Sequence, residues 1–437
     1  ITCTRRATPV MINVTVAGNS CRDEDGGGIA CGETNPTMIN CVVWNNDPPE
    51  IRNVEAIEAT FSNFEGGFEG EGNIDEDPLF IDPEEGDYHL TEDSPCIDTG
   101  DPESEEDPDG TRADMGAFYF HQEPQDEDGL LYVPDEYETI QQAIDTAVVG
   151  DSVLVSPGEY VENINFSGKA IAVIGNPENP GEVVIDGDSS GTVVTFENEE
   201  TLEAILNGFS IQNGSAEYAG GIKFNAASPR VMNCIISNNS AASSGGGIYC
   251  IRSSEPELSN LIITENHVGN GGGGVDVAGS SPSLYDCVIS NNTSDDFGAG
   301  MSNDLASPRV FNCVFSNNTS NGAGGAISNY THSYPIFVNC TITGNSSSDG
   351  GGIWNGMSFP LVINSIIWEN SPDEISGDQA TVNFSNILGG FDGESNIDSD
   401  PLFTDPENSD FRLTEGSPCI DVGTTFFVLD EDTVFSL

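Results

Sequence analysis

The chain has 437 residues, with 11 Lys and Arg against 73 Asp and Glu, which gives a formal charge of −62 at pH 7. Nucleic-acid binding and docking on anionic lipid both need basic patches, so this composition excludes them. Hydrophobic residues form 36% of the chain, enough for a thin core, and no apolar run is long enough to span a bilayer. The acidic excess is typical of an extracellular or cell-surface protein surrounded by salt or divalent cations.

A long internal duplication organises the chain. The sequence INCVVWNN at 39–46 returns as INSIIWEN at 363–370, and NIDEDPLF at 73–80 returns as NIDSDPLF at 396–403. Both copies continue into SPCID, and the offset of 323 to 324 residues gives the length of one full unit. We therefore expect the C-terminal part of a first solenoid at 1–120, a linker at 121–130, a second solenoid at 131–423, and a tail at 424–437.

Three carboxylates surround a glycine turn near the end of the first unit. Asp107, Asp109 and Asp114 resemble in spacing the first half of a calcium loop, although the distal glutamate of such a loop is missing. We expect calcium to bind here, with a solvated acidic loop as the alternative. No zinc-type cysteine spacing appears.

The start of the second unit has helical periodicity. Apolar residues at 140, 143, 144, 147 and 148 share one face, and Gly150 is a C-cap residue. We expect a short helix that ends there and caps the open end of the second solenoid, because an uncapped end would expose a sheet edge. Strands should follow from residue 152.

Two markers then recur together about every 26 residues, which indicates a solenoid with one coil per period. One is an Asn-Cys pair, and its cysteines should form a buried column: Cys234, Cys287, Cys313 and Cys340. A thiol ladder and strained disulfides both fit this column. The second marker is an apolar residue, mostly after a glycine pair, as at Ile248.

An asparagine stands five residues after the column position in each coil. These residues should form a ladder in which each amide bonds the copies above and below: Asn239, Asn266, Asn292, Asn318, Asn345 and Asn370. Asn19 and Asn46 repeat the pattern in the first unit. A row of asparagines that reads glycans is the functional alternative.

Several motifs carry a resemblance to known families. TIQQAIDTAVVGDSVLVSPGEY at 139–160 is similar to the N-terminal cap segment of the right-handed parallel β-helices of the pectin-lyase-like superfamily. GGAI at 324–327 and FSNN at 315–318 resemble the repeats of polymorphic outer-membrane adhesins. DPLF, SPCIDTG and DGTRADMGAF (109–118) resemble the closing segment of bacterial surface proteins labelled choice-of-anchor Q. The resemblance implies an all-β right-handed parallel β-helix at a bacterial cell surface.

The two ends of the chain fit a longer polypeptide. The register places Ile1 inside a coil, and the second unit lacks the DMGAF sequence that closes the first. We therefore expect the natural chain to extend past Leu437.

The main functional hypothesis is a secreted structural or adhesive solenoid whose tandem units form a rod or filament through self-association or contacts with surface glycans. The alternative is a polysaccharide-acting enzyme, of lyase or hydrolase type, or a carbohydrate-binding module. The outward positions after the second marker include Lys223, Tyr249, Asp276 and Trp354. We expect them to form a solvated face without a catalytic site. An outer groove lined with aromatic rings and converging charges would instead favour the alternative.

Overall fold

The structure is a computed structural model that describes residues 1–3, 8–21, 27–31, 36–47, 51–52, 57–121, 129–430 and 433–436. The chain forms two compact units, Ile1–Glu127 and Asp128–Leu437, called unit 1 and unit 2 below. Most of the expected linker, residues 122–128, lies outside the described residues. Strands run through both units, and the described part contains one α-helix, α1 (Ile140–Thr146).

Unit 1 contains three parallel three-stranded sheets and a hairpin. The sheets are β1 (Thr2–Cys3), β4 (Ile29–Cys31) and β7 (Ile51–Arg52); β2 (Val10–Ile12), β5 (Thr37–Ile39) and β8 (Glu58–Thr60); and β3 (Thr15–Ala17), β6 (Val42–Trp44) and β9 (Asn63–Phe64). The antiparallel hairpin is β10 (Phe80–Asp82) with β11 (Asp87–Leu90). A small core that includes Met38 and Phe64 fills the coils.

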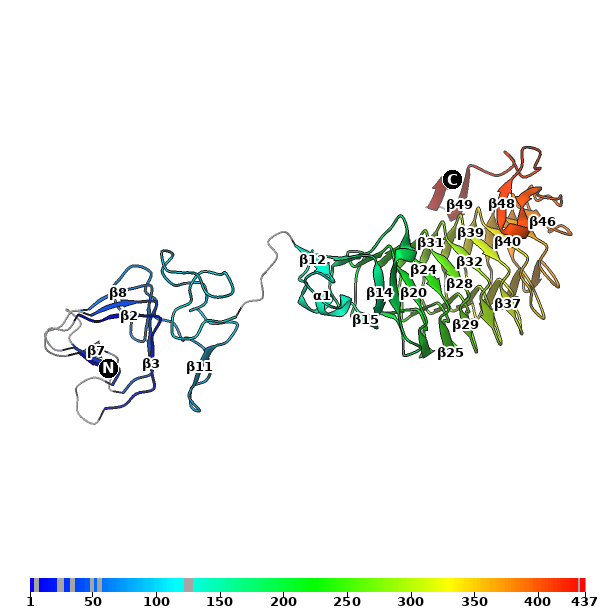
Figure 1. Ribbon diagram of the computed structural model, residues 1–437. Helices are drawn as coiled ribbons and strands as arrows, with labels where there is room; N and C mark the ends of the chain where they lie inside the picture. The colour runs from blue at the N-terminus through cyan, green and yellow to red at the C-terminus, as the bar shows by residue number, and fades with distance from the viewer. Residues whose placement is uncertain are drawn as a thin grey trace. The chain divides into compact units, whose positions relative to one another are not determined.

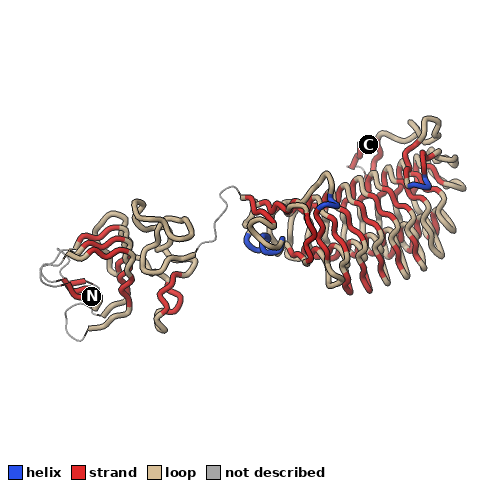
Figure 2. Tube along the Cα trace, viewed as in Figure 1, coloured by secondary structure: helices blue, strands red, loops and turns tan. Residues whose placement is uncertain are grey.

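Unit 2 is a parallel β-helix built from long sheets, whose strands lie in successive rows in Figures 1 and 2. The eleven-stranded sheet consists of β12 (Leu130–Val133), β13 (Ser152–Val155), β16 (Ala172–Ile174), β19 (Ile205–Asn207), β23 (Arg230–Met232), β27 (Glu257–Ser259), β31 (Ser283–Tyr285), β35 (Arg309–Phe311), β39 (Ile336–Val338), β42 (Leu361–Ile363) and β45 (Thr381–Asn383).

The second long sheet of unit 2 has ten strands: β14 (Gly158–Val161), β17 (Val183–Asp186), β20 (Ser210–Gln212), β24 (Ile235–Ser237), β28 (Ile262–Thr264), β32 (Val288–Ser290), β36 (Val314–Ser316), β40 (Thr341–Thr343), β43 (Ile366–Trp368) and β46 (Asn386–Ile387). The third has nine: β15 (Ile164–Asn165), β18 (Val194–Phe196), β22 (Ile222–Asn225), β26 (Ile248–Ile251), β30 (Val275–Ala278), β34 (Met301–Asp304), β38 (Ile327–Tyr330), β41 (Ile353–Gly356) and β44 (Ile375–Gly377).

Short elements complete unit 2. A five-stranded sheet lies before the nine-stranded sheet in each of its coils and consists of β21 (Ser215–Tyr218), β25 (Ser240–Ser244), β29 (His267–Val268), β33 (Thr293–Ser294) and β37 (Thr319–Ser320). Two hairpins follow the last coil of the β-helix: β47 (Phe403–Asp405) with β48 (Asp410–Leu413), and β49 (Phe426–Asp430) with β50 (Thr433–Ser436). The 3₁₀ turns are η2 (Pro180–Glu182) and η3 (Pro406–Asn408).

Strand register confirms the period of about 26 residues. Ile248 pairs with Val275 and with Ile222, and the same column continues through Met301, Ile327 and Ile353. Side chains alternate along each strand, so that Ile248 and Cys250 are fully buried while Tyr249 between them points outward. Each coil therefore adds one or two apolar residues per sheet to one continuous core.

The asparagine column runs through buried positions inside the turns that follow the ten-stranded sheet. Asn292 Nδ2 donates to Ile263 O at 2.9 Å and to Asn318 Oδ1 at 3.0 Å, and every neighbouring pair from Asn239 to Asn370 repeats this geometry. The column ends on the carboxylate of Glu374, which accepts from Asn370. Asn19 donates to Asn46 in the same way in unit 1.

The left-handed backbone belongs to the residue before each ladder asparagine, for example Asn238, Asn291 and Asn317. The ladder asparagine itself uses its amide to bind neighbouring coils, whereas the preceding residue makes the turn.

The cysteine column is fully buried and unpaired. Cys234, Cys287, Cys313 and Cys340 are free thiols, and Cys287 N donates to Cys313 Sγ at 3.4 Å. Burial raises the pKa of Cys234 to about 11 and that of Cys340 to about 12, so these thiols stay protonated at neutral pH.

Helix α1 ends at Thr146, four residues before the expected Gly150. The Lys169 ammonium takes the last carbonyls, at 2.8 Å from Ile144 O and from Ala147 O, and Glu162 accepts from the first helical N–H groups. Opposite charges at the two helix ends match the helix dipole. The helix packs on β12, β13 and β15 (Figure 1); protection of the solenoid end stays a prediction.

No helix within the described ranges has the length and apolar character that crossing a membrane requires.

Candidate functional site

One outer column of the nine-stranded sheet gathers chemically varied side chains. Strand pairing places these residues one above another on successive coils: Lys223, Tyr249, Asp276, Ser302, Ser328 and Trp354. We expected a solvated face, and this is wrong for the middle of the column. Asp276 is 5% exposed and Ser328 is fully buried, so other segments of the chain cover these two side chains.

The cover comes from the connections between the five-stranded and nine-stranded sheets. In the coil of Asp276, Gly271 has φ of +86°, and a Cβ there would lie 2.3 Å from Asp276 Oδ2. Only glycine lets the backbone come so close to the carboxylate. In the next coil the corresponding connection carries Phe297, whose ring lies 5.0 Å from that of Tyr330.

Burial makes the Asp276 carboxyl hard to ionise. Loss of solvation raises its pKa to about 7, and hydrogen bonds with Ser244, the Gly272 backbone and Ser302 oppose this rise only in part. The nearby Asp304 carboxylate raises the pKa further. Asp276 is therefore partly protonated at neutral pH, which suits a group that gives or takes a proton.

Asp304 is the second carboxylate of the site. It points outward from β34, two residues after Ser302, and Ser302 is the direct neighbour of Asp276. In parallel strands, backbone positions related in this diagonal way lie roughly 8 Å apart. Asp304 is exposed, unlike Asp276, so the two carboxylates sit in contrasting environments.

Aromatic rings frame the carboxylates. The rings of Tyr330 and Trp354 lie 5.0 Å apart, and Phe297 lies 6.4 Å from Trp354. On the other side, Tyr218 stacks on Tyr249 at 6.2 Å and 17°. The rings thus come from five coils and flank Asp276 on both sides.

Two adjoining hollows open between these rings. The first, of about 330 Å³, contains Asp276, Asp304 and Tyr330 in its walls. The second, of about 440 Å³, lies over Lys223 and Arg252. Tyr249 lines both, so they form one groove along the sheet, called the outer groove below.

Two hydroxyls beside the groove are enclosed by protein, and a lysine at its far end is paired. The buried hydroxyls of Tyr330 and Ser328 make no well-formed hydrogen bond among the described residues, although Ser328 lies near enough to oppose the rise in the Tyr330 pKa that burial causes. At the far end Lys223 Nζ binds Glu197 at 2.9 Å.

The asparagine and cysteine columns predicted as structural lie inside the coils and outside this groove. Their side chains bind neighbouring coils, so they position the sheets that carry the groove. A second internal column was missed: Asn303 Nδ2 donates to Asn329 Oδ1 at 2.9 Å, and Asn329 Nδ2 donates to Asn355 Oδ1 at 2.8 Å. Its 26-residue spacing was visible in the sequence.

The acidic turn of unit 1 uses its carboxylates to hold its own backbone. Asp107 Oδ2 accepts from Asp114 N at 2.8 Å, and Asp109 Oδ1 accepts from Thr111 N at 3.2 Å. Asp114 accepts from the Asp98 and Phe120 backbones, and burial raises its pKa to about 6. Within the described ranges no three carboxylate, imidazole or thiol groups converge as metal ligands would, so calcium binding remains a prediction.

Comparison with known proteins supports the fold. A family described as "Right handed beta helix region" matches residues 181–370. Similar solved structures include pectate lyase Pel9A, with 15% identity and a TM-score of 0.43 over 68% of this chain and 88% of that one. A pectin methylesterase from Aspergillus niger has 13% identity and a TM-score of 0.36, over 57% of this chain and 90% of that one. The carrot pectin methylesterase has 11% identity and a TM-score of 0.36, over 58% and 87%. No curated protein matches the sequence.

Proposed function

We propose that this protein binds a polysaccharide along the outer groove of unit 2. The observation that carries the proposal is the buried Asp276 between aromatic rings from five coils, in the wall of a groove along the sheet. Sugar rings have apolar faces and hydroxyl rims, which suit aromatic walls with a few polar groups. The sequence favoured a structural or adhesive role over a polysaccharide-related one. An outer groove with aromatic rings and converging charges reverses that order.

The charge of the groove selects the kind of polysaccharide. Asp276, Asp304 and Glu217 line it, and only Lys223 and Arg252 oppose them. The whole chain is also strongly acidic. Like charges in a partly buried groove repel, so neutral or amino-sugar chains should bind better than polyuronates.

The two carboxylates extend the proposal from binding to cleavage. Protonated Asp276 would act as general acid toward a glycosidic oxygen, and ionised Asp304 as general base toward water. Strand geometry places their backbone positions roughly 8 Å apart, which leaves the carboxyl groups room to adopt the separation of about 6.5–9.5 Å that inverting glycosidases use. Binding without cleavage would leave the first proposal intact and remove only this extension.

The test measures retention of the whole protein in gels that contain neutral, amino-sugar or uronic acid polysaccharides. Tyr249→Ala should weaken retention by about tenfold, because the ring lines both hollows. Tyr285→Ala is the matched control, since Tyr285 stacks on Phe311 on the outer side of the eleven-stranded sheet. Equal loss in both variants, or no retention of the unmodified protein, would refute the proposal.

Cleavage is tested separately with soluble substrates of the retained class. Release of reducing ends should fall at least about a hundredfold in Asp276→Asn and in Asp304→Asn. If retention persists while neither variant changes product release, the protein binds and does not cleave.

A structural or adhesive role is the second proposal, and the duplicated unit supports it. The repeated closing part indicates tandem arrays, which add length without an obvious new site, and the asparagine column ties the coils together, as Asn292 does with Asn318. We propose a secreted bacterial surface protein whose units self-associate into filaments, with α1 capping unit 2 and calcium bound at Asp107, Asp109 and Asp114. Electron micrographs of native material that showed only separate particles would contradict the filament.

A further inference from the structure

The two hollows that make up the outer groove differ in charge. The hollow over Lys223 and Arg252 contains these two cations and Glu217 in its walls. The other hollow, called the acidic half below, contains the carboxylates of Asp276 and Asp304. Among the described residues that line it there is no Lys, Arg or His. A chain that lies along the groove therefore meets an excess of negative charge at one end only.

The Asp276 carboxylate is buried without a cationic partner. It is 5% exposed. The groups that act on its ionisation are the hydroxyls of Ser244 and Ser302, the Gly272 backbone and the Asp304 carboxylate, and none of these carries a positive charge. A buried carboxylate without a counter-charge is costly, so a cation that reaches it is held strongly.

One acceptor position of this carboxylate remains open. A carboxylate has about four lone-pair positions, and the two hydroxyls and the backbone group named above use three. Gly271 closes one side, because a Cβ there would lie 2.3 Å from Asp276 Oδ2. Ser294 Oγ holds this cover in place by donating to Gly271 O at 3.0 Å. The remaining opening faces the acidic half and admits one small N–H or O–H donor.

Aromatic rings and a second carboxylate surround that opening. The rings of Phe297 and Tyr330 line the acidic half together with that of Tyr249. Ring faces attract cations and also pack on the apolar faces of sugars. Asp304 lines the same hollow and is exposed. The acidic half thus combines two anionic acceptors with walls that suit a sugar ring.

We propose that the acidic half binds the free ammonium group of an amino sugar between Asp276 and Asp304. This inference rests on the polysaccharide binding proposed above and narrows the ligand to chains whose amino groups are not acetylated. A primary ammonium brings both the small N–H donor and the positive charge that the site lacks. A quaternary ammonium has no N–H to donate, and an acetylated amine has no charge.

The proton balance of binding involves Asp276 and its neighbours. The titratable groups around the acidic half are Tyr249, Cys250, Asp296, Asp304 and Tyr330. Burial raises the pKa of both tyrosines and of the cysteine, so these three stay neutral near pH 7. The proton that a bound cation displaces therefore comes from Asp276.

The ammonium and this proton compete for the same carboxyl. With a pKa of about 7, Asp276 is mostly protonated at pH 6. An amine beside an electron-withdrawing group, like the α-amino group, has an ordinary pKa of about 7.7–8.0 and is mostly charged there. Binding at pH 6 should release a proton. The bound ammonium also keeps Asp276 ionised, so it removes the general acid and inhibits any cleavage in the same groove.

The experiment titrates the whole protein with an oligomer of glucosamine and with its N-acetylated form, which differ only in the charge of the nitrogen. At pH 7 the free amine should bind at least about tenfold more tightly. Calorimetry at pH 6, in two buffers with different ionisation enthalpies, measures the protons released. The free amine should release more than half a proton per site, and the acetylated form should release none.

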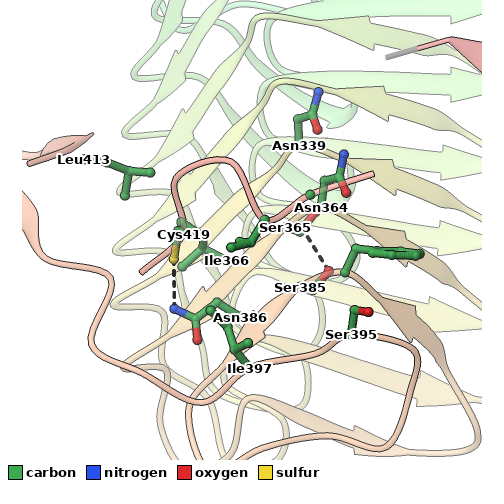
Figure 3. A pocket seen from close by; sticks show the side chains of 13 residues that line it. Asn339, Asn364, Ser365, Ile366, Ser385, Asn386, Ser395, Ile397, Leu413 and Cys419 are labelled. Atoms are coloured by element: carbon green, nitrogen blue, oxygen red, sulfur yellow. Dashed lines mark hydrogen bonds between the residues drawn. The ribbon is translucent and has the colours of Figure 1, made fainter. Parts of the chain in front are cut away.

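Variants of the protein locate the site. Asp276→Asn should remove the proton release and most of the preference for the free amine, while continued binding of the acetylated form shows that the groove is folded. The control lies in another hollow of unit 2, of about 220 Å³, which Ile366, Leu413 and Cys419 line (Figure 3). Its described lining residues include no Asp or Glu, so Leu413→Ala should change neither quantity.

Three results would overturn the inference. They are equal or tighter binding of the acetylated form, proton release that persists in Asp276→Asn, and binding of neither oligomer. The first two leave polysaccharide binding in place. After the third, retention of the protein in gels of neutral polysaccharide decides the proposed function separately.

Discussion

Two outer faces of unit 2 are built by the same coils and differ in chemistry. The ten-stranded sheet presents a regular column of small hydroxyls: Ser237, Thr264, Ser290, Ser316 and Thr343. The nine-stranded sheet presents Tyr249, Asp276 and Trp354 in one column and carries the outer groove. The difference lies in what adjoins each sheet.

Tight turns follow the strands of the ten-stranded sheet. A left-handed asparagine, such as Asn291, turns the chain inward, and the next residue enters the ladder. The nine-stranded sheet is preceded by longer glycine-rich connections, and these carry Gly271 and Phe297 over the outer column. Repetition thus fixes the scaffold, and variation in one set of connections makes the candidate site.

The largest expected effect concerns Asp276 and pH. Its folded pKa of about 7 lies above the ordinary value of 3.8, so the folded state binds more protons than the unfolded state between these values. Stability is therefore fully present below about pH 4 and is lost as pH rises toward 7. The loss is of order 4 kcal/mol as an upper bound, from about 1.4 kcal/mol for each pKa unit.

Asp276→Asn should remove that dependence, as measured by urea unfolding between pH 4 and 8. Asp304→Asn, on the exposed carboxylate of the same groove, is the control and should keep the slope. An unchanged slope in Asp276→Asn would mean that the carboxyl is solvated in the folded protein.

The second prediction compares the interior of the turns with the outer column beside it. Asn292→Ala removes the acceptor of Asn266 N and Nδ2 and the donor to Ile263 O. Buried groups left without partners cost about 1–3 kcal/mol each, so we expect about 3 kcal/mol from chemical unfolding. Ser290→Ala, two residues earlier on the outer face, should cost less than about 0.5 kcal/mol. Similar losses would contradict the ladder's stabilising role.

The smallest expected effect concerns ions. Coils about 4.8 Å apart bring carboxylates within a Debye length of about 10 Å at 0.1 M salt. Removing salt and calcium should therefore lower the melting temperature by a few degrees. The Asp109→Asn variant tests the calcium site, because it should lose any shift that calcium gives at constant ionic strength. Melting that is insensitive to both chelator and salt would show that the repulsion is negligible.

The sequence predicted what repetition determines. A fixed period places Asn292 over Asn318 and Cys287 over Cys313, because a solenoid stacks equivalent positions. It could not predict that Asp276 is buried, since the covering residues Gly271 and Phe297 belong to connections that do not repeat. The end of α1 was misplaced because Lys169, more than twenty residues later, takes the last helical carbonyls. Such effects depend on contacts between coils that no local pattern contains.

The most direct test of the account is a crystal structure of the protein with a neutral or amino-sugar oligosaccharide of the class that it retains in gels. The account predicts sugar rings against Tyr249 and Tyr330, with a sugar oxygen within hydrogen-bonding distance of Asp276. A sugar chain bound along the serine and threonine column of the ten-stranded sheet, with the outer groove empty, would contradict it.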